Sequence, residues 1–163
     1  LLLTELAANY QFFKADTALV LCREAIELAA RNQFPKGQVG ALTRLGEVYR
    51  LRGEFPQALE AHFHALQLSR QAGESSEEAN ALSFAAIVYL ELGEYRQALN
   101  YLLRSETLYR DLPAEPTEGE LFSRKLAYAG FRLSNIGEAY EKLGELDSAL
   151  AFQKQALGQP SRG

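Results

Sequence analysis

Apolar residues recur along this chain at spacings of three and four, which is typical of one face of an amphipathic α-helix. Glycine and proline interrupt the pattern: Gly53 ends one apolar run, Pro56 opens the next, and Gly73 closes it. The pattern predicts helices and no strand, over residues 2–13, 16–32, 37–51, 56–72, 76–92, 95–111, 118–142 and 146–157. Candidate capping boxes precede two of them, Ser75 with Glu78 and Thr117 with Glu120.

A short pattern of residues repeats within these helices. In each copy a tyrosine lies four residues before a glycine, and that glycine lies five residues before an alanine. The three copies are Tyr49, Gly53 and Ala58; Tyr89, Gly93 and Ala98; and Tyr140, Gly144 and Ala149. Self-similarity at a fixed period indicates stacked helix pairs, because a single pair cannot bury its apolar face alone.

The repeats are not uniform. Counted from Ala18 in the first unit, the matching alanines are 40, 40 and 51 residues apart. The first unit is degenerate, with Asn9 in place of the tyrosine and Phe13 in place of the glycine, as expected of a terminal repeat. The eleven extra residues fall in 111–125, where prolines predict a loop and the next helix is expected to start about two turns early.

These repeated residues resemble the tetratricopeptide repeat family, whose pattern has Leu-Gly before a tyrosine in one helix and spaced alanines in the next. The second unit carries the match through Leu42, Leu45, Gly46, Tyr49, Ala58 and Ala65. The third matches more loosely and the fourth well, through Leu82, Ala85, Ala86, Tyr89, Ala98 and Ser105, and through Leu133, Ile136, Gly137, Tyr140, Ala149 and Ala156. The departures are a period longer than the family's usual 34 residues and a missing terminal proline.

The resemblance implies an all-α, right-handed superhelical solenoid of about four antiparallel helix pairs. The units are expected near 1–34, 37–73, 76–112 and 118–158, in one domain over 1–163. The longer period is similar to that of repeats in bacterial multidomain regulators, including sensor kinases and transcription activators, and in kinesin light chains. Because the chain has no methionine, even at residue 1, we interpret it as a segment of a longer protein.

In the resembling family, the first helices line a concave groove that binds peptides or partner domains. The residues at those positions here are Thr43, Arg44, Glu47 and Arg50; Asn80, Ser83, Phe84, Ile87 and Glu91; and Phe131, Ser134, Asn135, Glu138 and Lys142. Some members hold a terminal carboxylate there with two asparagines and several basic residues. The corresponding positions carry Thr43, Glu47, Asn80, Phe84 and Asn135, so this clamp is not expected.

Two interpretations stay open for several of these residues. Phe84 and Ile87 either form an exposed apolar patch for a partner or pack against the neighbouring unit. Arg44, Arg50 and Asn135 either contact a bound peptide or belong to a solvated helix face.

Composition and charge narrow the class of function. The chain is 47% hydrophobic and 23% charged, with a net charge of −4, and its basic residues are not clustered on one face as a nucleic-acid site requires. No apolar stretch is long enough to insert in a membrane, and Leu1–Leu3 is too short for a secretory signal. A single cysteine, Cys22, excludes an internal disulfide and fits a reducing, cytoplasmic location.

The residues capable of chemistry favour packing roles. His62 and His64 are two apart, which places them on different helix faces, whereas a metal pair needs a spacing of three or four. His62 stands where the family has Phe and Cys22 at the same position of the first unit, so both are expected to pack, with His64 facing solvent. Glu54, Glu94 and Glu145 follow glycines and are expected in solvated turns. No catalytic triad order, phosphate-binding loop or nucleotide fingerprint occurs, so no metal, cofactor or enzymatic activity is expected.

The sequence therefore predicts a non-enzymatic protein–protein interaction module, acting as the sensory or regulatory part of a larger bacterial signalling protein. One alternative is a purely architectural segment that extends or self-associates through the open ends of the solenoid. Its last helix, with Leu150 and Leu157, has no obvious polar cap. Another is that catalysis resides in flanking domains such as a kinase.

Overall fold

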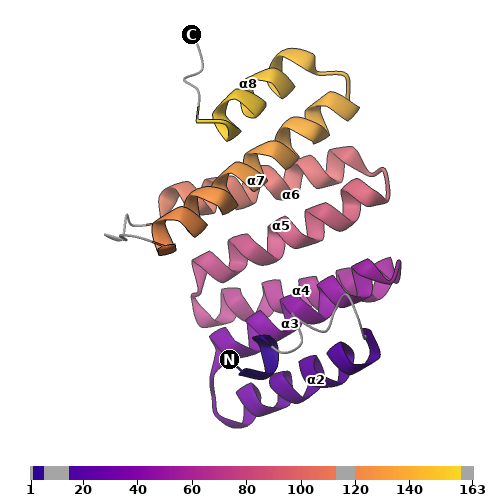
Figure 1. Ribbon diagram of the computed structural model, residues 1–163, viewed down its shortest axis with the longest axis vertical. Helices are drawn as coiled ribbons and strands as arrows, with labels where there is room; N and C mark the ends of the chain where they lie inside the picture. Colours follow the sequence, from indigo (N-terminus) through magenta and orange to yellow (C-terminus); the bar gives the residue numbers. More distant parts are fainter. Residues whose placement is uncertain (1, 6–14, 113–119, 159–163) are drawn as a thin grey trace.

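A computed structural model describes residues 2–5, 15–112 and 120–158 of the chain, with only the backbone given for 120–128. The helices are α2 (Ala15–Arg31), α3 (Pro35–Leu51), α4 (Phe55–Ala72), α5 (Ser75–Glu91), α6 (Tyr95–Asp111), α7 (Glu120–Lys142) and α8 (Leu146–Ala156) (Figure 1). Residues 2–5 are also helical, and no strand occurs in the described ranges. The predicted all-α solenoid of stacked helix pairs is confirmed.

Three turns between paired helices share one backbone geometry. Gly53, Gly93 and Gly144 have φ of 74°, 78° and 80°, in the left-handed region that glycine adopts without strain. The glutamate after each glycine donates its backbone N–H to the carbonyl of the repeated tyrosine at 2.9 Å, as Glu54 does to Tyr49. This bond satisfies a carbonyl that the helix end would otherwise leave unpaired. It explains the fixed interval between tyrosine and glycine in the sequence.

The predicted capping box at Ser75 is wrong. The N-cap of α5 is Glu74, and no side-chain cap bond forms there. Glu74 instead donates its backbone N–H to the carbonyl of Ser69 at 2.9 Å, and Glu78 accepts a hydrogen bond from Arg70 Nε at 2.7 Å. The turn is thus held by the end of α4 and an ion pair. The second proposed capping box involves Thr117, which lies outside the described residues, as do residues 6–13 of the first predicted helix.

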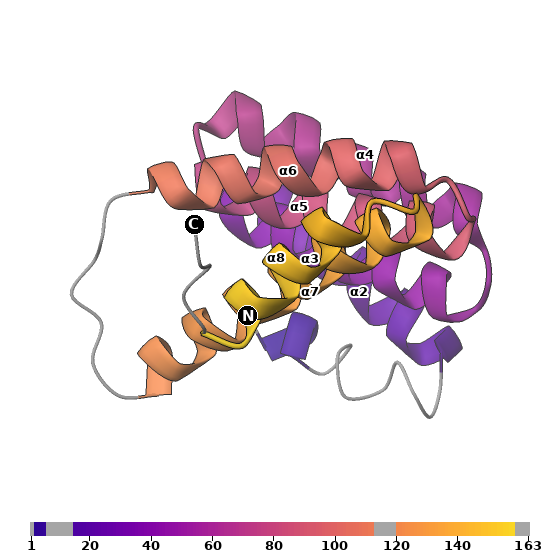
Figure 2. The same cartoon turned by 90° about the horizontal axis from the view of Figure 1, so that it is seen from above.

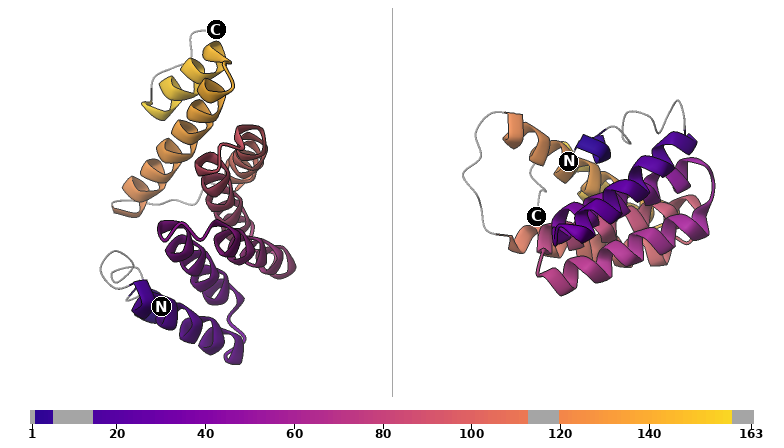
Figure 3. Two further views of the ribbon diagram at one scale, coloured as in Figure 1. Left: turned by 90° about the vertical axis from the view of Figure 1, so that its right-hand side faces the viewer. Right: turned by 90° about the horizontal axis from the view of Figure 1, so that it is seen from below.

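The helix pairs stack into a curved array. Each helix from α2 to α8 packs against the next in sequence, and α3 also contacts α5, while α5 contacts α7. Within the described segments no contact joins α4 to α6 or α6 to α8. The helices α3, α5 and α7 therefore lie on the inner, concave side, and α4 and α6 lie along the opposite side (Figures 2 and 3).

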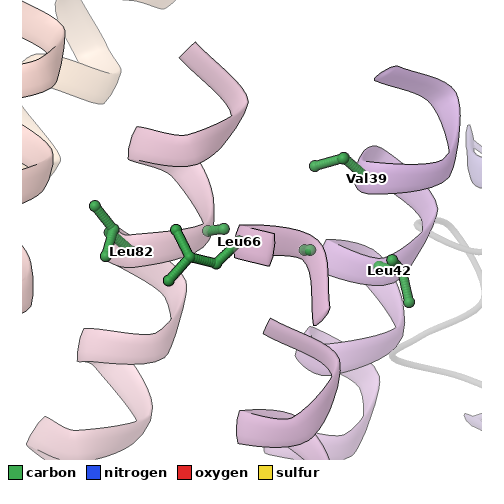
Figure 4. Close-up of a cluster of buried hydrophobic side chains, with 6 residues drawn as sticks. Val39, Leu42, Leu66 and Leu82 are labelled. Atoms are coloured by element: carbon green, nitrogen blue, oxygen red, sulfur yellow. The ribbon is translucent and has the colours of Figure 1, made fainter. Parts of the chain in front are cut away.

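The core is a thin layer shared between units. One cluster joins α3, α4 and α5 through Val39, Leu42, Ala65, Leu66, Ala81 and Leu82 (Figure 4). A second joins α5, α6 and α7 through Ala86, Leu102, Ile136 and Ala139. Burying each large aliphatic side chain stabilises the fold by about 1.5–3 kcal/mol. Because both clusters span a unit boundary, this stabilisation depends on stacking.

Two of the repeated tyrosines pack within their own units, whereas Tyr49 packs against Ala18 and Leu19 of α2. Tyr89 stacks on Tyr101 and Tyr140 on Phe152, each with ring centroids 5.5 Å apart.

The boundary between α6 and α7, the last in the array, has a polar contact. Arg132 of α7 lies 3.5 Å above the ring centroid of Tyr109 and donates to Glu106 of α6 at 3.3 Å. Also at this boundary, α7 has 23 residues against 17 in α3, which fits the predicted extension.

Candidate partner-binding surface

The predicted groove residues lie on α3, α5 and α7, and their exposure changes along the array. On α3, Thr43 and Glu47 are buried, each only 9% exposed. On α5, Phe84 and Ile87 are half-buried. On α7 the corresponding stripe is exposed, and it consists of Phe131, Ser134, Glu138 and Lys142. The concave side is thus closed at the centre of the chain and open towards its C-terminal part.

Three charged side chains join α3 to α5 on this side. Arg50 donates from Nε to Oε1 of Glu47 at 3.0 Å and from Nη2 to Oε2 at 3.1 Å. Its third nitrogen, Nη1, donates to Oε1 of Glu91 on α5. The two-pronged contact with Glu47 is the geometry in which a guanidinium matches a carboxylate best. We call Glu47, Arg50 and Glu91 the charge bridge.

A buried histidine lies beneath the charge bridge. His62 of α4 has no exposed surface, and its Nε2 is 3.7 Å from Oε1 of Glu47. Burial, followed by the positive charge of Arg50, lowers its pKa to about 3, so the ring is neutral at ordinary pH. The ring fits because a Cβ added at Gly46 of α3 would lie 2.4 Å from it. The predicted packing role of His62 agrees with this position, and His64 is exposed as expected.

The α5 residues are engaged largely inside the protein. Phe84 stacks on His62, with ring centroids 5.8 Å apart and an interplanar angle of 16°, so its packing against the neighbouring unit is observed. Asn80 accepts a hydrogen bond from Tyr109. The hydroxyl of Ser83 bonds that of Ser105 at 2.7 Å. These contacts leave Ile87 and Glu91 as the more accessible of the predicted α5 residues.

The pair His62 and Phe84 has a counterpart one unit earlier in Cys22 and Arg44, which are also 22 residues apart. Burial raises the pKa of the Cys22 thiol to about 11 even though the positive charge of Arg44 opposes the shift. The thiol is therefore protonated and unreactive, as expected of a small packing residue.

Several polar atoms along these helices have no partner in the described part of the chain. They are Oγ1 of Thr43, Nε of Arg44, both ring nitrogens of His62 and Nδ2 of Asn135. A buried donor without an acceptor costs free energy, on the order of 1–3 kcal/mol, so such atoms are candidates for contact with a bound group.

Sequence reasoning missed the pairing of Arg50 with Glu91. The spacing of the two residues, compared with the repeat interval, could have indicated this pairing. The two residues are 41 apart, one position more than the repeat interval, so stacking places them on adjoining turns of neighbouring helices. The burial of Glu47 carries no comparable signal, because it depends on how closely α4 and α5 pack against α3.

Other features of a catalytic or membrane site are lacking where the structure can be described. No group of three His, Cys, Asp or Glu side chains in these ranges is placed to hold a metal ion. No helix there has the length and apolarity needed to cross a bilayer. Two surface hollows of about 370 and 400 Å³ lie away from the charge bridge, one along α6 and one between residues 2–4, α2 and the start of α3.

Comparison with known structures gives the same architecture. A crystal structure of BtubC (BKLC) from P. vanneervenii has a TM-score of 0.78 at 16% identity, over 99% of this chain and 66% of that protein. A Rap protein in complex with competence and sporulation factor gives 0.78 at 16% identity, over 96% and 42%. A putative kinesin light chain of Podosopora anserina gives 0.71 at 17% identity, over 96% and 72%. This chain thus spans less than two thirds of the first two proteins, and at these identities the likeness shows the fold alone.

No match to the sequence was found among curated proteins. Family models do match it: two models described as tetratricopeptide repeat cover residues 37–111 and 133–159. These ranges hold the Leu-Gly-Tyr helices and the left-handed turns described above. The chain belongs to the tetratricopeptide repeat family.

Proposed function

We propose that this chain is a protein–protein interaction module that binds a peptide or a partner domain on its concave side. The family and fold are typically non-catalytic, which favours binding as the function. The observation that carries the proposal is the row of α3, α5 and α7, which places charged, polar and apolar side chains side by side on the inner surface. Such a surface offers both charge pairing and apolar anchoring to an extended segment.

The wider role we infer is regulatory. The module belongs to a larger bacterial signalling protein in the cytoplasm, and a bound partner changes the pitch of the array and so affects adjoining domains. The long period of the repeats, similar to that of bacterial multidomain regulators, supports this role.

The test compares the two sides of the array by photocrosslinking in a lysate of the source cells. One variant carries benzoylphenylalanine at Phe131, which is 51% exposed on α7, and a matched control carries it at His64, exposed on α4. We expect a specific adduct from position 131 and none from position 64. An adduct from position 64 alone would place the partner on the convex side and contradict the proposal.

A second candidate is self-association through the end of the array. Leu157 stands 91 residues after Leu66, the same interval that separates Ala149 from Ala58, so the two leucines are equivalent. Leu66 is 7% exposed because it packs with Leu82 of α5, whereas Leu157 is 76% exposed. An apolar side chain in this state favours contact with a further helix or with another copy of the chain.

Sedimentation over a range of concentrations tests this candidate. We expect the mass to rise with concentration for the natural chain and to stay monomeric for Leu157→Glu. A monomer at every concentration for both proteins would exclude self-association through this end.

A further inference from the structure

The charge bridge is not electrically balanced. It holds two carboxylates and one guanidinium, and His62 beneath it is neutral at ordinary pH. One negative charge therefore remains on the concave side between α3 and α5. A partly desolvated charge of this kind attracts an opposite charge more strongly than one in open water.

The remaining charge is accessible at one member of the bridge. The side chain of Glu47 is 11% exposed and is held by two bonds from Arg50, whereas that of Glu91 is 37% exposed and receives one. Over the described residues, the second oxygen of Glu91, Oε2, takes no hydrogen bond. It is thus the acceptor that a ligand can reach.

The neighbouring surface is apolar. Ile87 lies one helical turn before Glu91 on α5 and is half-buried, so part of it faces solvent beside the carboxylate. Phe84 lies one turn earlier and is fixed by its stack on His62. The surface therefore combines a hydrogen-bond acceptor with an apolar area whose side chains are held in place by packing.

We propose that the charge bridge and Ile87 form a subsite for a lysine or arginine side chain of a partner peptide, followed by an apolar residue. This inference rests on the proposed function and names the partner chemistry of the same surface. The basic group of the peptide bonds Oε2 of Glu91, whose other oxygen stays bonded to Arg50, and the apolar residue packs on Ile87. Unlike a clamp for a terminal carboxylate, the subsite requires a donor from the peptide.

The experiment selects binders from a random peptide library displayed on phage. The full chain is used as bait, and the selected peptides are synthesised and titrated by fluorescence anisotropy. Three variants are compared with the natural chain: Glu91→Gln removes the charge, Glu91→Asp retains it, and Glu60→Gln removes an exposed charge from α4 on the convex side. Circular dichroism confirms that each variant is folded at the temperature of the titration.

We expect selected peptides to be enriched in lysine or arginine next to an apolar residue. Glu91→Gln should weaken their binding by about tenfold, which corresponds to about 1.4 kcal/mol, while Glu91→Asp recovers part of the loss and Glu60→Gln has no effect. Addition of salt should reduce the difference between the natural chain and Glu91→Gln.

Two other outcomes separate this inference from the proposed function. Peptides that lose binding on Phe131→Asp but carry no basic residue, or carry acidic ones, would overturn the subsite and leave the concave surface as a binding site. Peptides that are insensitive to both Phe131→Asp and Glu91→Gln would overturn the proposed function together with the subsite.

Discussion

The central and the C-terminal parts of the concave side differ in how far their charges are satisfied within the protein. Between α3 and α5, Arg50 is shared by carboxylates from two helices and Glu47 is buried. On α7, Glu138 stands at the position that matches Glu47 and Lys142 at the position that matches Glu91, and both are exposed to solvent. The same positions of the repeat thus become an internal junction in one unit and remain an open surface in another.

The neighbouring packing accounts for this difference. Gly46 lets the flat ring of His62 lie against α3, and the stack of His62 on Phe84 brings α5 close. At the next boundary, Arg132 lies over Tyr109, and the α7–α8 pair is turned relative to α5–α6 in Figure 3. The small Gly46 and the flat rings of His62 and Phe84 thus allow α3 and α5 to approach closely. Between α5 and α7 the approach is less close, and the long side chain of Arg132 lies at that boundary.

The strongest test of this comparison is the pair Gly46→Ala and Gly137→Ala. A Cβ at Gly46 would lie 2.4 Å from the enclosed ring of His62, whereas at Gly137 the nearest atom, at 2.9 Å, is Cγ of the exposed Gln153 side chain. We expect Gly46→Ala to lower the free energy of unfolding by about 3 kcal/mol and Gly137→Ala by about 1 kcal/mol. Urea denaturation measures both, and equal losses would show that α3 packs on α4 as tightly as α7 packs on α8.

A somewhat smaller effect is expected from removing the shared cation. Arg50→Ala leaves Glu47 covered and without its two hydrogen bonds, which should lower stability by about 2 kcal/mol. In the double variant Glu47→Gln with Arg50→Ala, most of this loss should disappear, because no buried charge is left unpaired. If the losses of the two single variants simply added, the bridge would have no role in stability.

The buried histidine gives the α3–α5 region a pH dependence. The pKa of His62 is about 3 in the folded chain against 6.5 for a free histidine, so the unfolded chain binds a proton as pH falls below about 6.5 while the folded chain does not. Stability is therefore full above this pH and falls below it, by about 2 kcal/mol between pH 7 and pH 5.

The variant His62→Leu, which copies the buried Leu102 of the next unit, isolates this effect. Thermal unfolding followed over the same pH range should show a shallower decline for His62→Leu than for the natural chain. Parallel curves would mean that His62 is protonated in the folded protein.

The smallest effect is expected on α7. Lys142→Ala removes an exposed charge, so the free energy of unfolding should change by less than about 0.5 kcal/mol. A loss as large as that of Arg50→Ala, measured by the same denaturation, would show that α7 holds an ionic junction of its own.

The features of the fold that could be predicted from the sequence are those that recur in each repeat. The interval from Tyr49 to Gly53 encodes a local hydrogen bond, so both the turn and its recurrence could be predicted. The cap at Ser75 was mispredicted because backbone bonding after Gly73 satisfies the turn without the side chain. The accessibility of the groove residues could not be predicted, because the burial of Glu47 and Phe84 depends on how closely two units approach.

The link between α3 and α5 also has a mechanical consequence. Opening the concave side there would stretch the bond between Arg50 and Glu91, whereas no equivalent tie crosses from α5 to α7 among the described residues. Under tension along its axis, the array would behave as a spring with a stiff central segment and a compliant C-terminal one. Since salt weakens contacts between partly exposed charges, ionic strength would set the stiffness of the central segment.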